Sequence, residues 1–128
     1  MRTPTPLVAV LDDEPEMLKA IRRLLTCRGF RVDTYERGAD FLATLEGSPR
    51  PDCLVLDLHM PEMSGFDVLE AMRTRRVPVP VIVVTGHDGP GMEERSRMSG
   101  AVGYLKKPVD RDDLLSAIAE ATSSAGSG

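Results

Sequence analysis

Two apolar segments that stop at carboxylates constrain the fold of this chain most strongly. Leu7 to Leu11 is an unbroken apolar run that is followed by Asp12 and Asp13. Cys53 to Leu56 repeats the pattern and is followed by Asp57. Continuous apolar runs of this length are typical of strands that are buried on both faces, as in parallel sheets covered by helices. The pattern therefore predicts two buried strands with acidic ends.

With three more strand candidates, the chain offers five strands in all, and five helical patterns alternate with them. The strand candidates are residues 7–11, 32–35, 53–56, 79–84 and 104–105. Amphipathic spacing predicts helices that begin near Pro15 and around residues 41, 66 and 114, whereas the Gly-rich residues 86–100 predict only a short, poorly anchored helix. Strands that alternate with helices in this way predict an α/β domain, with helices on both faces of a parallel sheet.

The composition excludes several classes of protein. A length of 128 residues and a formal net charge of -4 fit one mildly acidic domain without a nucleic-acid-binding surface. No apolar run approaches the roughly 18 residues that span a bilayer, and none near the N-terminus is long enough for a signal peptide, so we expect a cytoplasmic protein. Cys27 and Cys53 lack metal-ligand spacing, and both are expected to be reduced.

Polar residues follow four of the predicted strands. They are Asp12, Asp13, Asp57, Thr85 and Lys107. The carboxyl ends of parallel strands meet at one edge of a sheet, where ligands bind, so these side chains are expected to converge. Taken singly, each aspartate is more typical of a helix cap, and the lysine of a solvated surface. The combination is harder to attribute to capping.

The convergence of three carboxylates has a chemical consequence. Neighbouring buried carboxylates repel one another, so either their pKa values rise or a cation lies among them. Oxygen ligands without softer His or Cys partners fit Mg²⁺. An ammonium and a hydroxyl opposite the cation would serve a phosphoryl group. The set therefore predicts a phosphoryl site whose nucleophile is itself a carboxylate.

Four motifs in the same order resemble the receiver domains of two-component response regulators. They are residues 10–14, 56–61, 83–86 and 104–108. The resemblance spans about residues 6–121, and residues 85–87 with 100–102 are most similar to receivers of the nitrogen-fixation transcription regulator class. It implies a flavodoxin-like (βα)5 fold, doubly wound, with strand order 2-1-3-4-5. The expected boundaries are a receiver domain over 1–121 and a flexible tail or truncated linker over 122–128.

The resemblance also implies a role for each site residue. Asp57 would accept the phosphoryl group, and Lys107 would pair with Asp57 or its phosphate. Mg²⁺ would be held by Asp12, Asp13, Asp57 and the main-chain carbonyl of His59. The Lys107–Pro108 peptide bond would be cis. The His59 side chain, two residues after Asp57, is placed to influence the water that attacks the acyl phosphate, but an exposed loop residue explains it better.

A conformational switch is implied as well. Thr85 would move to hydrogen-bond the phosphoryl group, and Tyr104 would turn inward, although an ordinary aromatic at a sheet edge would look the same in sequence. Two features depart from the family. Residues 93–97 make the fourth helix almost wholly polar, so we expect it to be frayed or displaced without phosphate. Gly103 stands where receivers that dimerise through this face often carry an acid.

The leading hypothesis is a phospho-accepting receiver. It would take its phosphoryl group from a sensor histidine kinase or a phosphotransfer protein and would signal to a downstream output domain or protein. It would catalyse only its own phosphorylation and dephosphorylation, bind neither nucleic acid nor membrane, and form a phosphorylation-dependent dimer at most. The alternatives are a phosphorylation-independent binding module on the same fold and a Mg²⁺-dependent aspartyl-phosphate phosphatase. Phosphatases of that kind usually carry the nucleophile after the first strand, whereas Asp57 follows the third.

Overall fold

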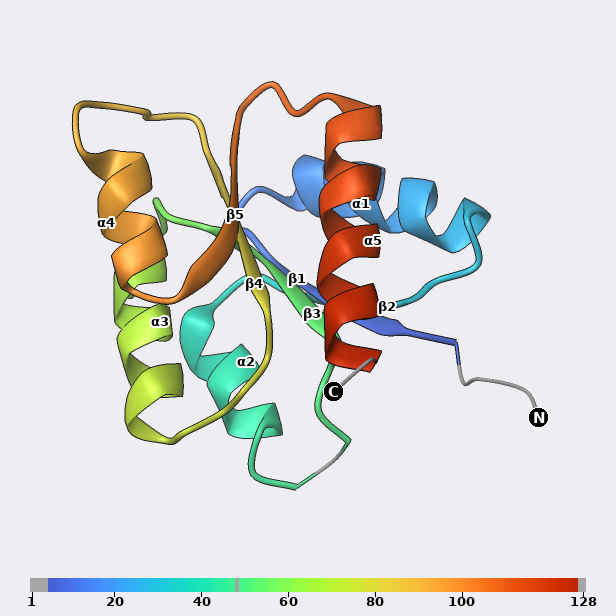
Figure 1. Cartoon of the computed structure of the whole chain (residues 1–128), viewed down its shortest axis with the longest axis horizontal. Coiled ribbons are helices and arrows are strands. Elements are labelled where there is room, and N and C mark those ends of the chain that lie inside the picture. Colours follow the sequence, from blue (N-terminus) through green and yellow to red (C-terminus); the bar gives the residue numbers. More distant parts are fainter. Residues whose placement is uncertain (1–4, 48, 127–128) are drawn as a thin grey trace.

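Five strands alternate with five helices between Leu7 and Gly126. The computed structural model describes residues 5–47 and 49–126, which Figure 1 shows in sequence colours. The elements in chain order are β1 (Leu7–Leu11), α1 (Pro15–Cys27), β2 (Arg31–Tyr35), α2 (Gly38–Thr44), β3 (Cys53–Asp57), α3 (Gly65–Thr74), β4 (Val81–Thr85), α4 (Met92–Met98), β5 (Ala101–Lys106) and α5 (Arg111–Gly126).

All neighbouring strands are parallel, in the order β2-β1-β3-β4-β5. The chain adds β2 on one side of β1 and every later strand on the other side. The strand order therefore reverses between β1 and β3, which pair with Leu11 opposite Leu56. The residues that follow these two strands lie at the point where open parallel sheets bind ligands. The predicted fold class and strand order are confirmed.

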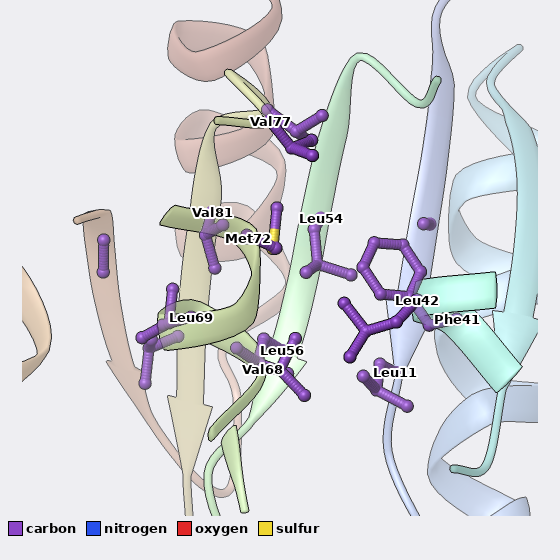
Figure 2. Packing of buried hydrophobic residues seen from close by; sticks show 14 of the residues in the cluster. Leu11, Phe41, Leu42, Leu54, Leu56, Val68, Leu69, Met72, Val77 and Val81 are labelled. Atoms are coloured by element: carbon purple, nitrogen blue, oxygen red, sulfur yellow. The ribbon is translucent and has the colours of Figure 1, made fainter. Parts of the chain in front are cut away.

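Helices cover both faces of the sheet (Figure 1). One apolar cluster packs α2 and α3 against the sheet, and Figure 2 shows Phe41 and Leu42 meeting Leu54 and Leu56 of β3. A second cluster packs α1 and α5 against the opposite face. Alternate side chains of β3 enter the two clusters, which is why this strand and β4 are buried along their whole length. No helix in the two described stretches is long and apolar enough to cross a membrane.

The structure corrects three predicted boundaries. β4 begins at Val81, two residues later than predicted, because Pro80 has no N–H for the ladder, although the Pro80 carbonyl still accepts a bond from the Leu54 N–H at 2.9 Å. β5 runs from Ala101 to Lys106 because it pairs along all of β4, whereas its apolar signal was only two residues long. α5 continues to Gly126, so residues 122–126, predicted as flexible tail, are helical, and 127–128 lie outside the described residues.

The helix α4 is short and weakly anchored, as predicted. Its only buried residue is Ser96, whose hydroxyl donates to the Met92 carbonyl of the same helix at 2.9 Å. The N-cap is Gly91 in the left-handed conformation, without a side-chain cap. The guanidinium of Arg95 lies 3.8 Å from the centroid of the Phe66 ring, and this contact joins α4 to the start of α3. The helix therefore rests on polar and cation–π contacts, with little apolar burial of its own.

Amide hydrogen exchange tests how firmly α4 is held. We expect the amides of residues 92–98 to exchange at least tenfold faster than those of Val81–Val84 in the unphosphorylated protein, because local opening of α4 exposes little apolar surface. NMR or mass spectrometry can compare both segments in one sample. Equal protection in the two segments would contradict the expectation.

Candidate functional site

Two buried carboxylates form the floor of the candidate site. Asp12 follows β1 and Asp57 is the last residue of β3, and each is only 3% exposed. One carboxylate oxygen from each of Asp12, Asp13 and Asp57 lies within 4.8 Å of the others. Asp13 is half-buried at the rim of the site. The three aspartates that sequence patterns predicted to converge are therefore brought together.

Lys107 supplies the positive charge of the site. Its backbone N–H donates to the Thr85 carbonyl at 2.8 Å, which fixes the residue beside the end of β4. Its Nζ lies 3.0 Å from Asp12 Oδ2 and 3.6 Å from Asp57 Oδ1. The Lys107–Pro108 peptide bond is cis, as the resemblance implied. The ammonium lies within ion-pair distance of both buried carboxylates.

Glu14 joins this network, and sequence reasoning missed it. Its Oε1 accepts a hydrogen bond from Lys107 Nζ at 2.8 Å, the shortest of the lysine's three ion-pair distances. The backbone N–H of Glu14 donates to Asp12 Oδ1 at 2.9 Å. Its position directly after Asp13 was the available signal, but the prediction took only the two acids nearest the end of the first strand and stopped before Glu14.

Burial and like charge set the protonation of the floor. Burial, and then the neighbouring Asp12 carboxylate, raise the pKa of Asp57 to about 7, although Lys107 opposes the shift. Burial also raises the pKa of Asp12, against the hydrogen bonds from the Glu14 N–H and from Lys107. Burial alone would lower the pKa of Lys107, but the carboxylates of Glu14 and Asp12 outweigh it and raise that pKa. The site therefore has more negative charge than one lysine neutralises.

Thr85 and two histidines cover the end of β4. The Thr85 side chain is fully buried, and its Oγ1 accepts a hydrogen bond from the His87 N–H at 3.0 Å. His59 Nδ1 lies 3.4 Å from the same oxygen, and the His59 and His87 rings contact each other at a tilt of 43° with centroids 4.4 Å apart. The His59 N–H is directed to Asp57 Oδ1 at 3.4 Å. The expected role of the His59 carbonyl toward a metal stays a prediction.

Tyr104 lies on β5 and pairs with Val83, two residues before Thr85 on β4. Its hydroxyl donates to Asp88 Oδ1 at 2.6 Å, and Asp88 Oδ2 also lies 3.8 Å from Lys106 Nζ. Burial, and then the hydrogen bond and charge of Asp88, raise the pKa of Tyr104 to about 12. Asp88 is a second site residue that sequence reasoning missed. It holds the tyrosine to the loop between β4 and α4.

Close packing fixes the loop between β3 and α3. A Cβ at Gly65 would lie 2.7 Å from the Asp57 carbonyl oxygen and 2.8 Å from Leu58 Cα, so no larger residue fits there without a backbone shift. Ser64 and Asp67 form a reciprocal capping box that satisfies backbone N–H groups at the start of α3. The start of α3 is therefore built against the end of the strand that carries Asp57.

The fold and this acidic edge together define a receiver domain. The sequence profile described as "Response regulator receiver domain" matches residues 8–119. The chain belongs to this family, the receiver domains of two-component response regulators.

Individual relatives agree with the family assignment. The transcriptional regulatory protein KdpE of Mycobacterium tuberculosis is 40% identical over 109 residues, which are 85% of this chain and 47% of KdpE. The transcriptional regulatory protein FixJ of Rhizobium meliloti is 34% identical over 115 residues, which are 90% of this chain and 56% of FixJ. The chain thus spans about half the length of these curated relatives.

Solved structures show the same fold. The FixJ-N crystal structure superposes with a TM-score of 0.86 at 32% identity, covering 94% of this chain and 96% of that one. A CheY-like response regulator receiver domain protein from Methanospirillum hungatei gives a TM-score of 0.89 at 26% identity, covering 97% of this chain and 98% of that one. KdpE is more identical to this chain than FixJ is, so the expected special likeness to the nitrogen-fixation class stays a prediction.

The raised pKa of Asp57 predicts a pH-dependent stability. The folded protein binds a proton at Asp57 more tightly than the unfolded chain does. The contribution of this group to the stability of the fold is therefore lost as pH rises from about 3.8 to about 7. Above that range, and with a chelator present, we expect Asp57→Asn to raise the free energy of unfolding by roughly 1–4 kcal/mol. Urea unfolding at several pH values measures it, and a gain that does not shrink toward acid pH would contradict it.

The Asp88 contact predicts the ionisation of Tyr104. Asp88→Asn removes the charge beside the phenol, so the pKa of Tyr104 is expected to fall from about 12 toward the ordinary value of about 10. The chain has two tyrosines and no tryptophan, so tyrosinate absorbance in a Tyr35→Phe background reports Tyr104 alone. Asp112→Asn, which removes an exposed acid of α5, serves as the control. An unchanged titration in the Asp88 variant would refute the assignment.

Proposed function

We propose that this chain is a phosphorylation-dependent switch that accepts a phosphoryl group on Asp57. The donor would be a sensor histidine kinase or a phosphotransfer protein, and the recipient of the signal an output domain or partner protein. The observation that carries the proposal is the position of Asp57, buried at the carboxyl edge of the sheet between two other carboxylates and Lys107. A cytoplasmic location is part of the proposal.

The donor set fits Mg²⁺. The three aspartates offer only carboxylate oxygens within 4.8 Å of one another, and burial with like charge raises the pKa of two of them, so a hard cation would relieve the repulsion. Asp12, Asp13 and Asp57, with the His59 main-chain carbonyl, would hold it. A bound Mg²⁺ would neutralise charge on the phosphoryl oxygens.

The proposed reaction uses the carboxylate of Asp57 as nucleophile. One Asp57 oxygen would form a bond to the phosphorus of the donor while the bond from phosphorus to the donor nitrogen or oxygen breaks, and the leaving group takes that electron pair. Lys107 would then bind an oxygen of the new phosphoryl group, and the Thr85 hydroxyl would donate a hydrogen bond to another of its oxygens. Later hydrolysis would restore the carboxylate, so the chain would act only on itself and not on a separate substrate.

The signal would leave the site through Thr85 and Tyr104. Turning Thr85 toward a phosphoryl group would take its Oγ1 away from the His87 N–H and from His59. Tyr104, which packs against the apolar cluster that includes Val83, would turn inward once its bond to Asp88 is released. Because α4 is weakly anchored, the loop between β4 and α4 can move together with it. A phosphorylation-dependent dimer would follow from the same movement.

Chemical phosphorylation tests the proposal directly. Incubation with Mg²⁺ and acetyl phosphate or carbamoyl phosphate is expected to produce a base-labile phosphoryl adduct, visible as a mass increase of the intact protein. Asp57→Asn should abolish the adduct, because the amide is not a nucleophile under these conditions. Asp52→Asn, an exposed acid before the same strand, is the matched control and should be phosphorylated normally.

The alternatives give different results in the same experiment. Absence of any adduct with Mg²⁺ and donor would favour a phosphorylation-independent binding module. Rapid release of inorganic phosphate from small phosphate esters would favour a phosphatase. An adduct that persists in Asp57→Asn would place the acceptor elsewhere and overturn the assignment.

A further inference from the structure

The lysine of the site is shared unequally between three carboxylates. Lys107 Nζ lies 2.8 Å from Glu14 Oε1, 3.0 Å from Asp12 Oδ2 and 3.6 Å from Asp57 Oδ1. The first two distances are hydrogen bonds, and the third is beyond hydrogen-bond range. In this structure the ammonium is therefore held on the Glu14 side, away from Asp57.

The Glu14 side chain is available to bind Lys107 because it does not cap its own helix, α1. It occupies the N-cap position of α1, where side chains commonly bond to the first free N–H groups, but its side chain makes no such bond. Pro15 at the first turn removes one of those donors. The backbone N–H of Glu14 is tied to Asp12 Oδ1 at 2.9 Å, which directs the residue toward the site. The side chain is thereby available to Lys107.

We propose that Glu14 is a positioning residue that draws Lys107 away from Asp57 in the unphosphorylated protein. The inference rests on the proposed function, since it explains how the acceptor carboxylate of Asp57 stays available while a lysine lies beside it. A lysine bound to Asp57 would compete with a divalent cation for that carboxylate. By binding the ammonium at the rim, Glu14 lowers that competition.

The strength of the Glu14 contact suits a reversible tether. The Glu14 side chain is 62% exposed, whereas that of Lys107 is 16% exposed, so water screens the pair from one side. Solvent-exposed ion pairs contribute little free energy and break easily. A phosphoryl group on Asp57 would offer more acceptor oxygens than Glu14 does and would recruit the lysine. The tether would thus act before phosphorylation and be released by it.

The first test measures Mg²⁺ binding to the purified full chain by isothermal titration calorimetry. Without Glu14, Lys107 is expected to move toward Asp57, so Glu14→Ala should raise the Mg²⁺ dissociation constant about three- to tenfold. Glu14→Gln, which keeps a neutral acceptor, should give a smaller rise in the same direction, and Glu14→Asp the smallest. The matched controls are Glu16→Ala and Glu16→Gln, because Glu16 lies in the first turn of α1, two residues after Glu14, and its one ion pair among the described residues is with Lys19, at 3.8 Å.

The second test needs neither metal nor phosphoryl donor. In urea unfolding with a chelator, the stabilisation produced by Asp57→Asn is measured in the wild type and in the Glu14→Ala background. If Glu14 withholds Lys107 from Asp57, its loss lets the lysine neutralise that carboxylate, so the gain from Asp57→Asn should fall by at least half. A merely structural role of Glu14 would lower stability equally in both backgrounds. The Glu16→Ala background should leave the gain unchanged.

The outcomes separate this proposal from the proposed function. Equal effects of the Glu14 and Glu16 variants on Mg²⁺ affinity, or an unchanged gain from Asp57→Asn without Glu14, would overturn the positioning role. A chain that forms no phosphoryl adduct but shows both expected shifts would refute the proposed function and leave the positioning role supported. If the chain binds no Mg²⁺, the unfolding cycle alone decides the role of Glu14.

Discussion

Asp12 and Asp57 end neighbouring strands and are almost fully buried, and the repulsion between their carboxylates governs the rest of the site. Burial removes the water that would screen them, so the pKa of Asp57 rises to about 7. One lysine meets both acids and is shared with Glu14. In the proposed function, the charge that remains is what would attract a cation and an incoming electrophile to this edge. A sheet end with polar neutral residues would be more stable and chemically inert.

The order of strands is what makes this arrangement possible. Because β1 and β3 are neighbours while β2 lies outside them, two separate apolar runs deliver their acidic ends to one point. β4 and β5 then add Thr85 and Lys107 on one side only. Asp12, Asp57, Thr85 and Lys107 thus lie at or directly after strand ends, and the apolar clusters on both faces hold those ends in place.

The sequence was sufficient for the sheet and for the five strand-end residues, because continuous apolar runs and their polar ends are local signals. Sequence patterns did not predict the features that tertiary packing determines, which are the ends of elements and the partners of charged side chains. β5 begins at Ala101, which pairs with Val81, and the exposed Val102 lies at a register shift before Gly103 pairs with Ile82. α5 continues past residue 121. Glu14 and Asp88 were missed because their partners, Lys107 and Tyr104, are distant in the chain. The partner of a charged side chain is set by three-dimensional placement, which periodicity does not encode.

The close packing at Gly65 makes the two flanks of Asp57 mechanically unequal. On the β3–α3 side the backbone is in tight contact and the helix begins with a reciprocal capping box, so this flank is stiff. On the β4–α4 side the helix begins at a left-handed glycine and buries one serine, so this flank is compliant. A structural change at Asp57 therefore moves the β4–α4 side more than the β3–α3 side. The direction in which this domain deforms is therefore set by its loops, before any partner is bound.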